Sequence, residues 1–351
     1  MITDLRLQNF RSYKDSSFEL SPGVNIIVGP NASGKTNLLE AILVLTKGTS
    51  YRAKDADLIK FDKPWARIDV NTLKTGSRTV KLFKDDTPNK IFELEGKTYK
   101  RLPQQQSLPV VLFEPNHLLM LSGGPERRRD YLDDLLEQTT PGYSALRRQY
   151  RRALAQRNSL LKQPSSNSQS NIFPWNIRLS ELAGQIVRAR EQITVQINDQ
   201  ITPLYKKLSK SKTKVTIDYQ HRWPSDQYET NLLKELDKSL PTDIARGFTT
   251  AGPHREDILA LFDGHPAPES ASRGEARTTI LTLKIIELKI IEAVRQTTPI
   301  LLLDDVFSEL DGKRRHSLTD YLAPYQTFIT TTDADLVIKN FTQKCNIIAL
   351  T

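Results

Sequence analysis

The most constraining stretch of this chain is "NIIVGPNASGKTNLLEAILVLTKG", residues 25–48. Its apolar start, 25–29, predicts a short buried strand, and the spacing of apolar residues at its end predicts a helix. Between them, "GPNASGKT" (29–36) matches the phosphate-binding pattern G-x-x-x-x-G-K-[ST]. A strand, a glycine loop and a helix in this order predict an α/β protein that binds a nucleotide at the N-terminus of the helix.

Each residue type in this phosphate-binding loop (P-loop, 29–36) has a physical reason. Glycines let backbone N–H groups converge on a phosphate, Lys35 would neutralise the β- and γ-phosphates, and the Thr36 hydroxyl would bind Mg²⁺. A glycine turn with an incidental lysine is the weaker interpretation, because the strand and helix stand where the mechanism needs them. The predicted ATP-binding residues here are Gly29, Pro30, Asn31, Ala32, Ser33, Gly34, Lys35, Thr36 and Asn37.

A second apolar strand ends in two carboxylates, in "ILLLDD" (300–305). Ligands of open α/β sheets bind at the carboxyl ends of the strands, which is where these side chains emerge. We predict that Asp304 holds Mg²⁺, directly or through water, and that Asp305 orients or deprotonates the attacking water. Acidic pairs after strands are common, so this pair alone does not identify a nucleotide site. Together with the P-loop it predicts nucleotide hydrolysis.

The stretch "SRGEARTT" (272–279) opens an apolar helix before that acidic strand. A Ser-x-Gly-[Gln/Glu] helix start in this place is typical of ABC-type ATPases, where it contacts the γ-phosphate held by the opposite subunit. Ser272 offers a short hydroxyl, and Gly274 permits close backbone approach to an anion. An ordinary capping box of Ser272 with Glu275 is the alternative. Both can hold, because capping alone does not explain Gly274.

Two further segments have the order expected of these ATPases. "SELD" (308–311) stands at the D-loop position, which predicts that Asp311 contacts the other subunit of a dimer. "TTTD" (330–333) stands at the switch position, where Thr332 or Asp333 replaces the histidine that is common in transporters.

The chain resembles the RecF family of bacterial recombination-repair ATPases, which are ABC/SMC-like P-loop proteins. The resemblance rests on segments that occur in order along nearly the whole chain, although 160–240 matches least. Ala32 and Glu275 depart from the family, which usually has glycine and glutamine there. The segments are "LRLQNFRSYKDSSFELSPGVNIIVGPNASGKTNLLEAI", "LFEPNHLLMLSGGPERRRDYLD", "TTAGPHREDI", "SRGEARTTILTLKIIEL" and "ILLLDDVFSELD".

This resemblance implies a mechanism and partners. Two ATP molecules with Mg²⁺ would lie between Lys35 of one subunit and Ser272 of the other, with Arg11 and Ser12 beside the nucleotide. The homodimer would form with ATP, bind duplex DNA and single/double-strand junctions, and work with RecR, and through it RecO, to load recombinase. Arg255 in "GPHRED" is typical of the family but has no assigned role. Its alternative is a structural ion pair with a neighbouring carboxylate.

Charge independently favours a nucleic-acid partner. The formal net charge is +9 and the pI about 9.4, which suits a polyanion, although charge also keeps proteins soluble. Basic clusters in or near the helical middle predict sequence-independent phosphate contacts, with a solvated helix face as the competing interpretation. The predicted contacts are Arg147, Arg148, Arg151, Arg152, Lys206, Lys207 and Lys210.

The order of predicted strands and helices indicates two lobes, and the composition indicates where the protein is located. We expect a discontinuous ABC-type ATPase lobe from 1–122 and 245–351, with an antiparallel meander about 66–101, and an inserted, mostly helical lobe at 123–244 with a flexible linker near 164–171. One cysteine, no signal-peptide pattern and no long apolar run predict a cytoplasmic protein without a membrane span.

Two other functions fit the P-loop less well. Three features argue against a transport ATPase subunit: the "NFRSY" start, the helical insert and the absence of a histidine at the switch position. The ATPase of a nuclease complex would carry a metal-binding nuclease domain after the acidic strand, and too few residues follow Asp305 for one.

Overall fold

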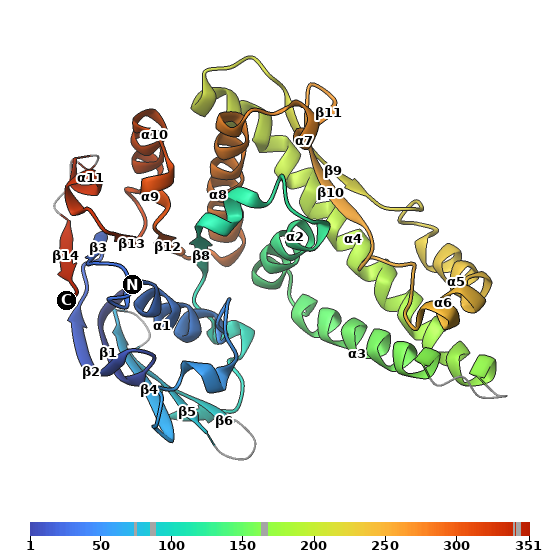
Figure 1. Ribbon diagram of the computed structural model, residues 1–351, viewed down its shortest axis with the longest axis horizontal. Helices are drawn as coiled ribbons and strands as arrows, with labels where there is room; N and C mark the ends of the chain where they lie inside the picture. The colour runs from blue at the N-terminus through green and yellow to red at the C-terminus, as the bar shows by residue number, and fades with distance from the viewer. Residues whose placement is uncertain (74–75, 85–88, 163–167, 340, 342–344) are drawn as a thin grey trace. The chain divides into compact units, whose positions relative to one another are not determined.

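The computed structural model describes residues 1–73, 76–84, 89–162, 168–339, 341 and 345–351. The chain divides into two compact units. Unit 1 contains Met1–Leu118 and Glu287–Thr351, and unit 2 contains Leu119–Ile286. Unit 1 is thus built from both ends of the sequence, as the colours of Figure 1 show.

The centre of unit 1 is a five-stranded parallel sheet in the order β14-β3-β13-β12-β8. Its strands are nearly continuous apolar runs because a parallel sheet is covered on both faces. Since the strands are parallel, their carboxyl ends meet at one edge, where the P-loop follows β3 and Asp304 ends β12. The bounds are β3 Val24–Val28, β8 Val110–Phe113, β12 Ile300–Asp304, β13 Thr327–Thr331 and β14 Asn346–Ala349.

A second sheet of unit 1 is antiparallel, in the order β2-β1-β4-β5-β6-β7. The segment predicted as a meander supplies its last four strands, and Glu95 and Gly96, both with positive φ, join β6 to β7. The bounds are β1 Ile2–Phe10, β2 Tyr13–Glu19, β4 Trp65–Thr72, β5 Gly76–Phe83, β6 Asn89–Leu94 and β7 Lys97–Tyr99.

Helix α1 (Lys35–Lys47) starts directly after the P-loop and contacts strands of both sheets. Its apolar residues and those of both sheets form one buried core. Gly48, at φ 85°, ends the helix with a hydrogen bond from its N–H to the Val44 carbonyl. The other helices of unit 1 are the 3₁₀ helices η1 (Asp55–Leu58) and η2 (Gln104–Gln106), and α9 (Val306–Glu309), α10 (Gly312–Leu322) and α11 (Ala334–Ile338).

Unit 2 is mostly helical, with a small antiparallel sheet in the order β11-β10-β9. Its long helix α4 packs against α3, α5 and β9. Helix α8 (Arg273–Arg295) begins in unit 2 and ends in unit 1, and η3 (Pro115–Leu119) reaches the boundary between them. The remaining bounds are α2 Pro125–Thr139, α3 Tyr143–Lys162, α4 Ser168–Ser209, β9 Val215–Gln220, α5 Tyr228–Lys238, α6 Leu240–Arg246, β10 Asp257–Phe262, β11 His265–Pro266 and α7 Ala267–Ser270.

Contacts group residues 245–286 with unit 2, whereas the sequence-based division places them in the ATPase lobe. The physical reason is that β10 pairs with β9 along its whole length, from Asp257 opposite Gln220 to Phe262 opposite Val215. Part of the expected linker, 164–167, lies outside the described residues, and its end, 168–171, belongs to α4.

Within the described part of the chain, none of the helices combines the length and the apolar character that crossing a bilayer would require.

Candidate nucleotide-binding site

The P-loop has a backbone that depends on glycine at Gly34. Its φ is 102°, and a Cβ added there would lie 2.8 Å from Ser12 Oγ and 3.1 Å from the Tyr13 hydroxyl oxygen. Tyr13 also donates a hydrogen bond to the Gly34 carbonyl at 3.0 Å. At Gly29 an added Cβ would approach the Leu350 carbonyl oxygen to 2.6 Å. The loop is therefore held closely by β1–β2 and the C-terminal strand, so side chains larger than hydrogen do not fit at these two positions.

Ala32 adopts a left-handed conformation, with φ 68°. An L-residue with a Cβ in this region costs roughly 1–2 kcal/mol relative to right-handed backbone. This geometry explains why glycine is the unstrained choice at this position, and why alanine is the smallest departure from it.

The Lys35 ammonium lies over the loop. Its Nζ donates hydrogen bonds to the carbonyl oxygens of Gly29 and Pro30, both at 2.7 Å. The cation is thus placed among the backbone groups that would surround a phosphate.

Thr36 and Asp304 are 268 residues apart in sequence, and their side chains meet. The Thr36 hydroxyl donates to Asp304 Oδ1 at 3.0 Å. Thr330, on β13, donates to the same oxygen at 2.8 Å, and the Tyr51 hydroxyl donates to Oδ2 at 3.2 Å. A hydroxyl and one oriented carboxylate beside a phosphate loop fit Mg²⁺, which binds through one or two carboxylates and substrate phosphates.

Tyr51 was not predicted from the sequence. Its burial, and then the neighbouring charge of Asp304, raise the pKa of the Tyr51 hydroxyl, so it remains a hydrogen-bond donor. No motif marks this tyrosine, which lies in the connection after α1. Its role emerges only because the fold places that connection beside β12.

Asp305 follows Asp304 with its backbone turned out of the strand. Its φ is 52°, and its N–H donates to the Thr330 hydroxyl at 2.9 Å. Ser308 donates to Asp305 Oδ1 at 3.1 Å. The turn separates the two carboxylates: Asp304 is buried beneath the loop, and the partly exposed Asp305 lies at the edge of the sheet.

Arg11 is engaged by a buried carboxylate beside the P-loop helix. It donates two hydrogen bonds to the fully buried Glu40, at 2.8 and 3.0 Å, and Arg52 contributes another at 3.2 Å. Burial raises the pKa of Glu40, but hydrogen bonds from Arg11, Arg52 and Ser50 outweigh it, so its pKa lies below the ordinary value. Glu40 and Arg52 were not predicted.

Ser12 and Asn37 also contact each other, since Asn37 Nδ2 donates to Ser12 Oγ at 3.1 Å. Asn37 Oδ1 in turn accepts from Arg52 at 2.7 Å. The predicted residues Arg11, Ser12 and Asn37 are therefore brought together on one side of the P-loop, by the turn between β1 and β2 and by the first turn of α1.

Ser272 forms the capping box that was one of its two interpretations. Ser272 N–H and hydroxyl both donate to Glu275 Oε2, at 2.9 and 2.8 Å, and Glu275 N–H donates back to Ser272 Oγ at 3.2 Å. Gly274 accepts from the Thr278 hydroxyl at 2.9 Å. Ser272 belongs to unit 2 and Lys35 to unit 1.

Asp311 caps the start of α10. It accepts a hydrogen bond from the Arg314 backbone N–H at 2.9 Å, and this bond lowers the pKa of Asp311; the Arg314 side chain also pairs with it. Thr332 and Asp333 are exposed after β13, where Asp333 N–H donates to the Thr331 hydroxyl at 3.1 Å.

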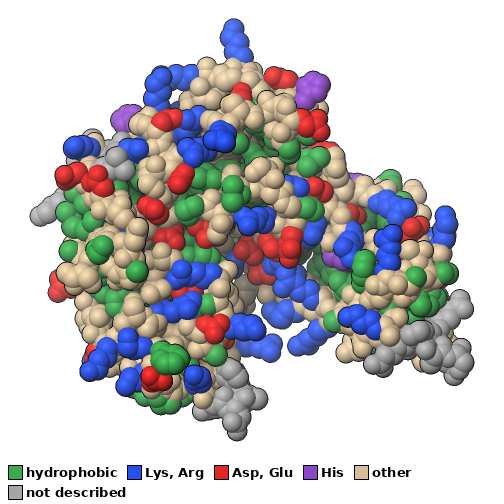
Figure 2. Space-filling model, in the orientation of Figure 1, with side chains coloured by type: hydrophobic (Ala, Val, Ile, Leu, Met, Phe, Trp, Pro, Cys, Tyr) green, Lys and Arg blue, Asp and Glu red, His purple; other side chains and the backbone are tan. Residues whose placement is uncertain are grey.

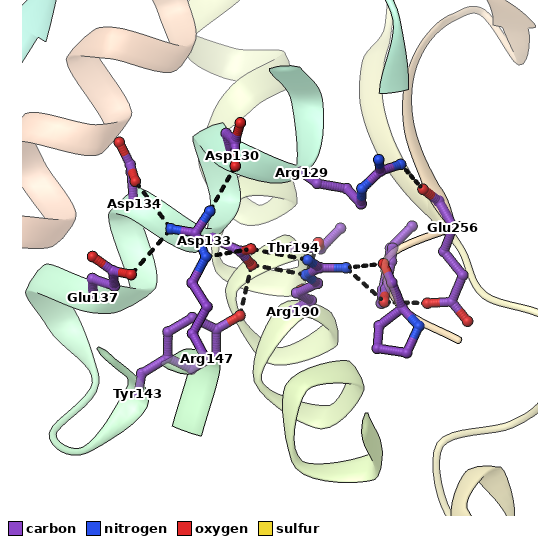
Figure 3. Close-up of polar contacts among 12 residues, drawn as sticks. Arg129, Asp130, Asp133, Asp134, Glu137, Tyr143, Arg147, Arg190, Thr194 and Glu256 are labelled. Carbon is purple, nitrogen blue, oxygen red and sulfur yellow. Dashed lines mark hydrogen bonds and ion pairs between the residues drawn. The ribbon is translucent and has the colours of Figure 1, made fainter. Parts of the chain in front are cut away.

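The prediction that Arg147 contacts DNA is wrong, because its side chain is buried and not available to a phosphate. It is buried and pairs with Asp130 at 2.6 Å, Asp133 at 3.1 Å and Glu137 at 3.0 Å. Figure 3 shows Asp133 between Arg147 and Arg190. Arg190 donates two hydrogen bonds to the Asp133 carboxylate. Burial lowers the pKa of Arg147, but these carboxylates outweigh it and raise the pKa above its ordinary value.

The other predicted DNA contacts have exposed side chains. Figure 2 shows basic side chains distributed over the visible surface, interspersed with acidic ones. The exposed residues of the predicted set are Arg148, Arg151, Arg152, Lys206, Lys207 and Lys210.

Arg255 is exposed and lies over an aromatic ring, with its guanidinium carbon 4.7 Å from the centre of Phe248. The two carboxylates that follow Arg255 in the sequence, Glu256 and Asp257, have other partners. Glu256 accepts hydrogen bonds from Tyr219 and Tyr228, and Asp257 pairs with Arg128.

Comparison with known proteins gives consistent matches over nearly the whole chain. The family described as "RecF/RecN/SMC N terminal domain" matches residues 1–349. The DNA replication and repair protein RecF of Lachnoclostridium phytofermentans is 34% identical over 346 residues, covering 97% of this chain and 95% of the relative. RecF of Bacillus subtilis is 34% identical over 349 residues, covering 95% and 94%.

Solved structures also match nearly the whole chain. The structure of the recombination mediator protein RecF-ATPrS in the RecFOR pathway matches with a TM-score of 0.88 and 30% identity, covering 100% of this chain and 97% of that chain. An SmcHead bound to the C-winged helix domain of ScpA matches with a TM-score of 0.54 and 16% identity, covering 99% and 93%, which concerns the fold alone. The predicted α/β fold of an ABC-type ATPase head is confirmed.

Proposed function

This chain belongs to the RecF/RecN/SMC family, in which its full-length matches are RecF proteins of DNA replication and repair, and we propose that it works as an ATP-dependent, DNA-binding clamp. The resemblance predicted from the sequence is confirmed: the chain is an ATP-binding ATPase of recombinational repair and replication. The observation that best supports the chemistry is the contact of Thr36 with Asp304 beneath the P-loop.

Different residues of the chain would bind the phosphates, hold Mg²⁺ and activate the attacking water. The P-loop N–H groups and Lys35 would bind the phosphates, and Thr36 and Asp304 would hold Mg²⁺, which supplies charge neutralisation at the β- and γ-phosphates. Thr330 and Tyr51 fix the Asp304 carboxylate, since each donates to one of its oxygens. Asp305, on the turn beyond, would accept a proton from the attacking water.

We also propose a composite site shared by two subunits. Ser272 and Gly274 of one copy would contact the γ-phosphate bound by Lys35 of the other, with Asp311 at the same interface. The support is the sequence order of the signature, the D-loop and the acidic strand, and the position of Ser272 and Gly274 at the start of α8, because helix N-termini attract anions. ATP would then join the subunits, and hydrolysis would release them.

Ser272→Ala is expected to weaken the ATP-dependent dimer by about tenfold or more, because it removes a hydrogen bond to a charged group. ATP binding to the monomer should be unchanged, since the P-loop is intact. Sedimentation at micromolar protein, with and without ATP, measures dimerisation, and nucleotide titration measures binding.

Capping and signature roles are separated by Ser272→Asp. Aspartate caps helices as well as serine does, but its carboxylate would repel the γ-phosphate. Both variants should therefore weaken the dimer. If Ser272→Asp dimerises like the wild type, Ser272 only caps α8. If the wild type stays monomeric with ATP, the composite site itself is refuted.

DNA and the mediator proteins complete the proposal. The clamp would bind duplex DNA and single/double-strand junctions without reading bases, act with RecR and through it RecO, and do so in the cytoplasm. Support comes from the net charge of +9, the exposed cations of α3 and α4, and the RecFOR pathway named for the similar structure. A gel-shift series with duplex, single-stranded and gapped DNA, with and without ATP, tests it.

Reversing Arg151 and Arg152 to glutamate is expected to weaken DNA binding and to reduce the slope of log affinity against log salt by about two, one for each phosphate that is no longer neutralised. Both side chains are exposed on α3. Reversing Lys97 and Lys100, also exposed but on the meander of unit 1, changes the net charge equally. If the two double variants behave alike, net charge and not this helix determines binding.

A further inference from the structure

A loop of unit 2 between α6 and β10, here called the anchored loop (249–256), is held by polar side chains of the helices around it. At its start, the Thr249 N–H donates to Asn158 Oδ1, on α3, at 2.9 Å. The N–H and the hydroxyl of Thr250 both donate to Oδ1 of the fully buried Asp243, on α6, at 3.1 and 2.6 Å.

The middle of the anchored loop is held in the same way. Arg190, on α4, donates to the Pro253 carbonyl at 2.8 Å. The Tyr150 hydroxyl, on α3, shares a hydrogen bond with His254 Nδ1 at 2.7 Å. These bonds order the loop before any ligand arrives, which lowers the conformational cost of binding one.

Arg255 is the side chain that this loop presents to solvent. Of residues 249–256, all of which the structure describes, Arg255 alone is exposed. Its Nε donates to the Thr249 carbonyl at 3.3 Å, and its guanidinium lies over the ring of Phe248. Within the part of the chain that the structure describes, its two terminal nitrogens have no carboxylate partner. The loop thus holds a guanidinium at a defined place with donors left over.

Arg129, on α2, is a second arginine at the same loop. Its Nη1 donates to the carbonyl of Glu256, the residue after Arg255, at 2.6 Å, as Figure 3 shows. Two carboxylates near it, Asp257 and Asp130, pair with other arginines. Burial lowers the pKa of Arg129 below its ordinary value and outweighs the attraction of the carboxylates around it. A bound anion would supply the missing compensation.

His254 reports the positive potential at this loop. Burial lowers the pKa of His254 to about 4, and the charges of Arg255 and Arg129 lower it further. Both guanidinium groups therefore lie within electrostatic range of one imidazole, which is neutral at pH 7. An anion at this place would meet two arginines, and charge-assisted hydrogen bonds from arginine to phosphate are among the strongest in proteins.

We propose that Arg255 and Arg129 bind a phosphate of the DNA backbone, with Phe248 holding the Arg255 guanidinium in place. The planar fork of arginine donors matches a phosphate and reads no base, in keeping with binding that does not depend on sequence. The proposal rests on the proposed DNA-binding function. It adds to the exposed cations of α3 and α4 a fixed site whose geometry, and not only its charge, matters.

The site is tested with lysine variants, which keep the charge and lose the fork. Arg255→Lys and Arg129→Lys should each weaken binding of a fluorescent gapped duplex by about tenfold, the loss of a hydrogen bond to a charged group. Arg152→Lys, at an exposed position of α3, is the matched control and should stay within about twofold, because a solvated cation acts as a point charge. Fluorescence anisotropy measures the affinities.

The part played by Phe248 is tested by Phe248→Leu, which keeps an apolar side chain and removes the aromatic face. Alone it should weaken DNA binding in the same direction as Arg255→Lys. Combined with Arg255→Lys it should add little, because residues that act through one contact are not additive. ATP titration and urea unfolding serve as controls. Both should be unchanged in every variant, since the P-loop belongs to unit 1 and the bonds that anchor the loop are kept.

DNA affinity of Arg255→Lys equal to that of Arg152→Lys overturns the proposal, because diffuse charge would then suffice. A loss of stability that parallels the loss of affinity also overturns it, since Arg255 would act on the fold. If Arg255→Lys binds inorganic phosphate less well but DNA as before, the site takes a small anion and the proposal is again wrong. A wild type that binds no DNA refutes the proposed DNA-binding function itself.

Discussion

Asp305→Asn lowers the rate of ATP hydrolysis by about 10²–10⁴-fold, the expected contribution of a general base, and leaves ATP binding close to that of the wild type. Asparagine has nearly the same shape, tolerates the positive φ of 52° at this position, and its side-chain oxygen can keep the hydrogen bond from Ser308. What it cannot do is accept the proton of the attacking water. Single-turnover hydrolysis with a nucleotide-binding titration measures both quantities.

The same variant should accumulate as an ATP-bound dimer, because binding persists while the step that releases the subunits is slowed. Asp320→Asn changes an exposed carboxylate on α10 that has no assigned role in the site, and it serves as the matched control for charge. Asp304→Asn should behave differently, with a raised requirement for Mg²⁺, since Asp304 is the carboxylate that Thr36 contacts. Rapid turnover by Asp305→Asn would remove Asp305 from the role of base.

The nucleotide loop could be predicted from the sequence because its physics is local. Glycine at Gly34 is required by a φ of 102° and by the close approach of Ser12, and such requirements leave a pattern in consecutive residues. The acidic strand is similar, since a buried apolar run ending in carboxylates places Asp304 at the sheet edge. That Thr36 and Asp304 would meet followed from the parallel sheet, in which β13 lies between β3 and β12.

Tyr51, Glu40 and Arg52 could not be predicted because their contacts depend on tertiary structure. Glu40 reads as a solvent-exposed position within an otherwise apolar helix, yet it is fully buried by two arginines from separate connections. Nothing in the residues around Tyr51 indicates that its hydroxyl reaches Asp304. These residues orient predicted ones, and orientation leaves no mark in local sequence.

The burial of Arg147 could have been predicted from the spacing of residues in α3. The buried positions of α3 are Tyr143, Arg147, Tyr150, Ala153, Arg157 and Leu161, and their spacing of three to four residues defines one helix face. Both arginines lie on the same stripe as two tyrosines, whereas Arg148, Arg151 and Arg152 lie off it. Treating "RRQYRR" as a single basic cluster overlooked this periodicity.

Arg157→Met is expected to destabilise unit 2 by about 3–5 kcal/mol, the usual cost of removing one partner of a buried ion pair. Arg157 and Asp243 are both fully buried and pair at 2.7 Å. Arg157 also donates to Asn176 at 2.7 Å and to the Thr249 hydroxyl at 2.8 Å. Methionine fills much of the same volume but satisfies none of these acceptors, and it leaves the Asp243 charge without its cation.

Urea unfolding followed by helical circular dichroism measures the loss, with Arg151→Met, at an exposed position of the same helix, as the control expected within about 0.5 kcal/mol of the wild type. Arg157→Met with Asp243→Leu should recover part of the stability, because the uncompensated charge is removed as well. Since Arg157 holds Thr249, at the start of the segment that carries Arg255, we also expect faster amide exchange there. A cost below about 1 kcal/mol for Arg157→Met would mean that water reaches Asp243 and that this pair does not organise unit 2.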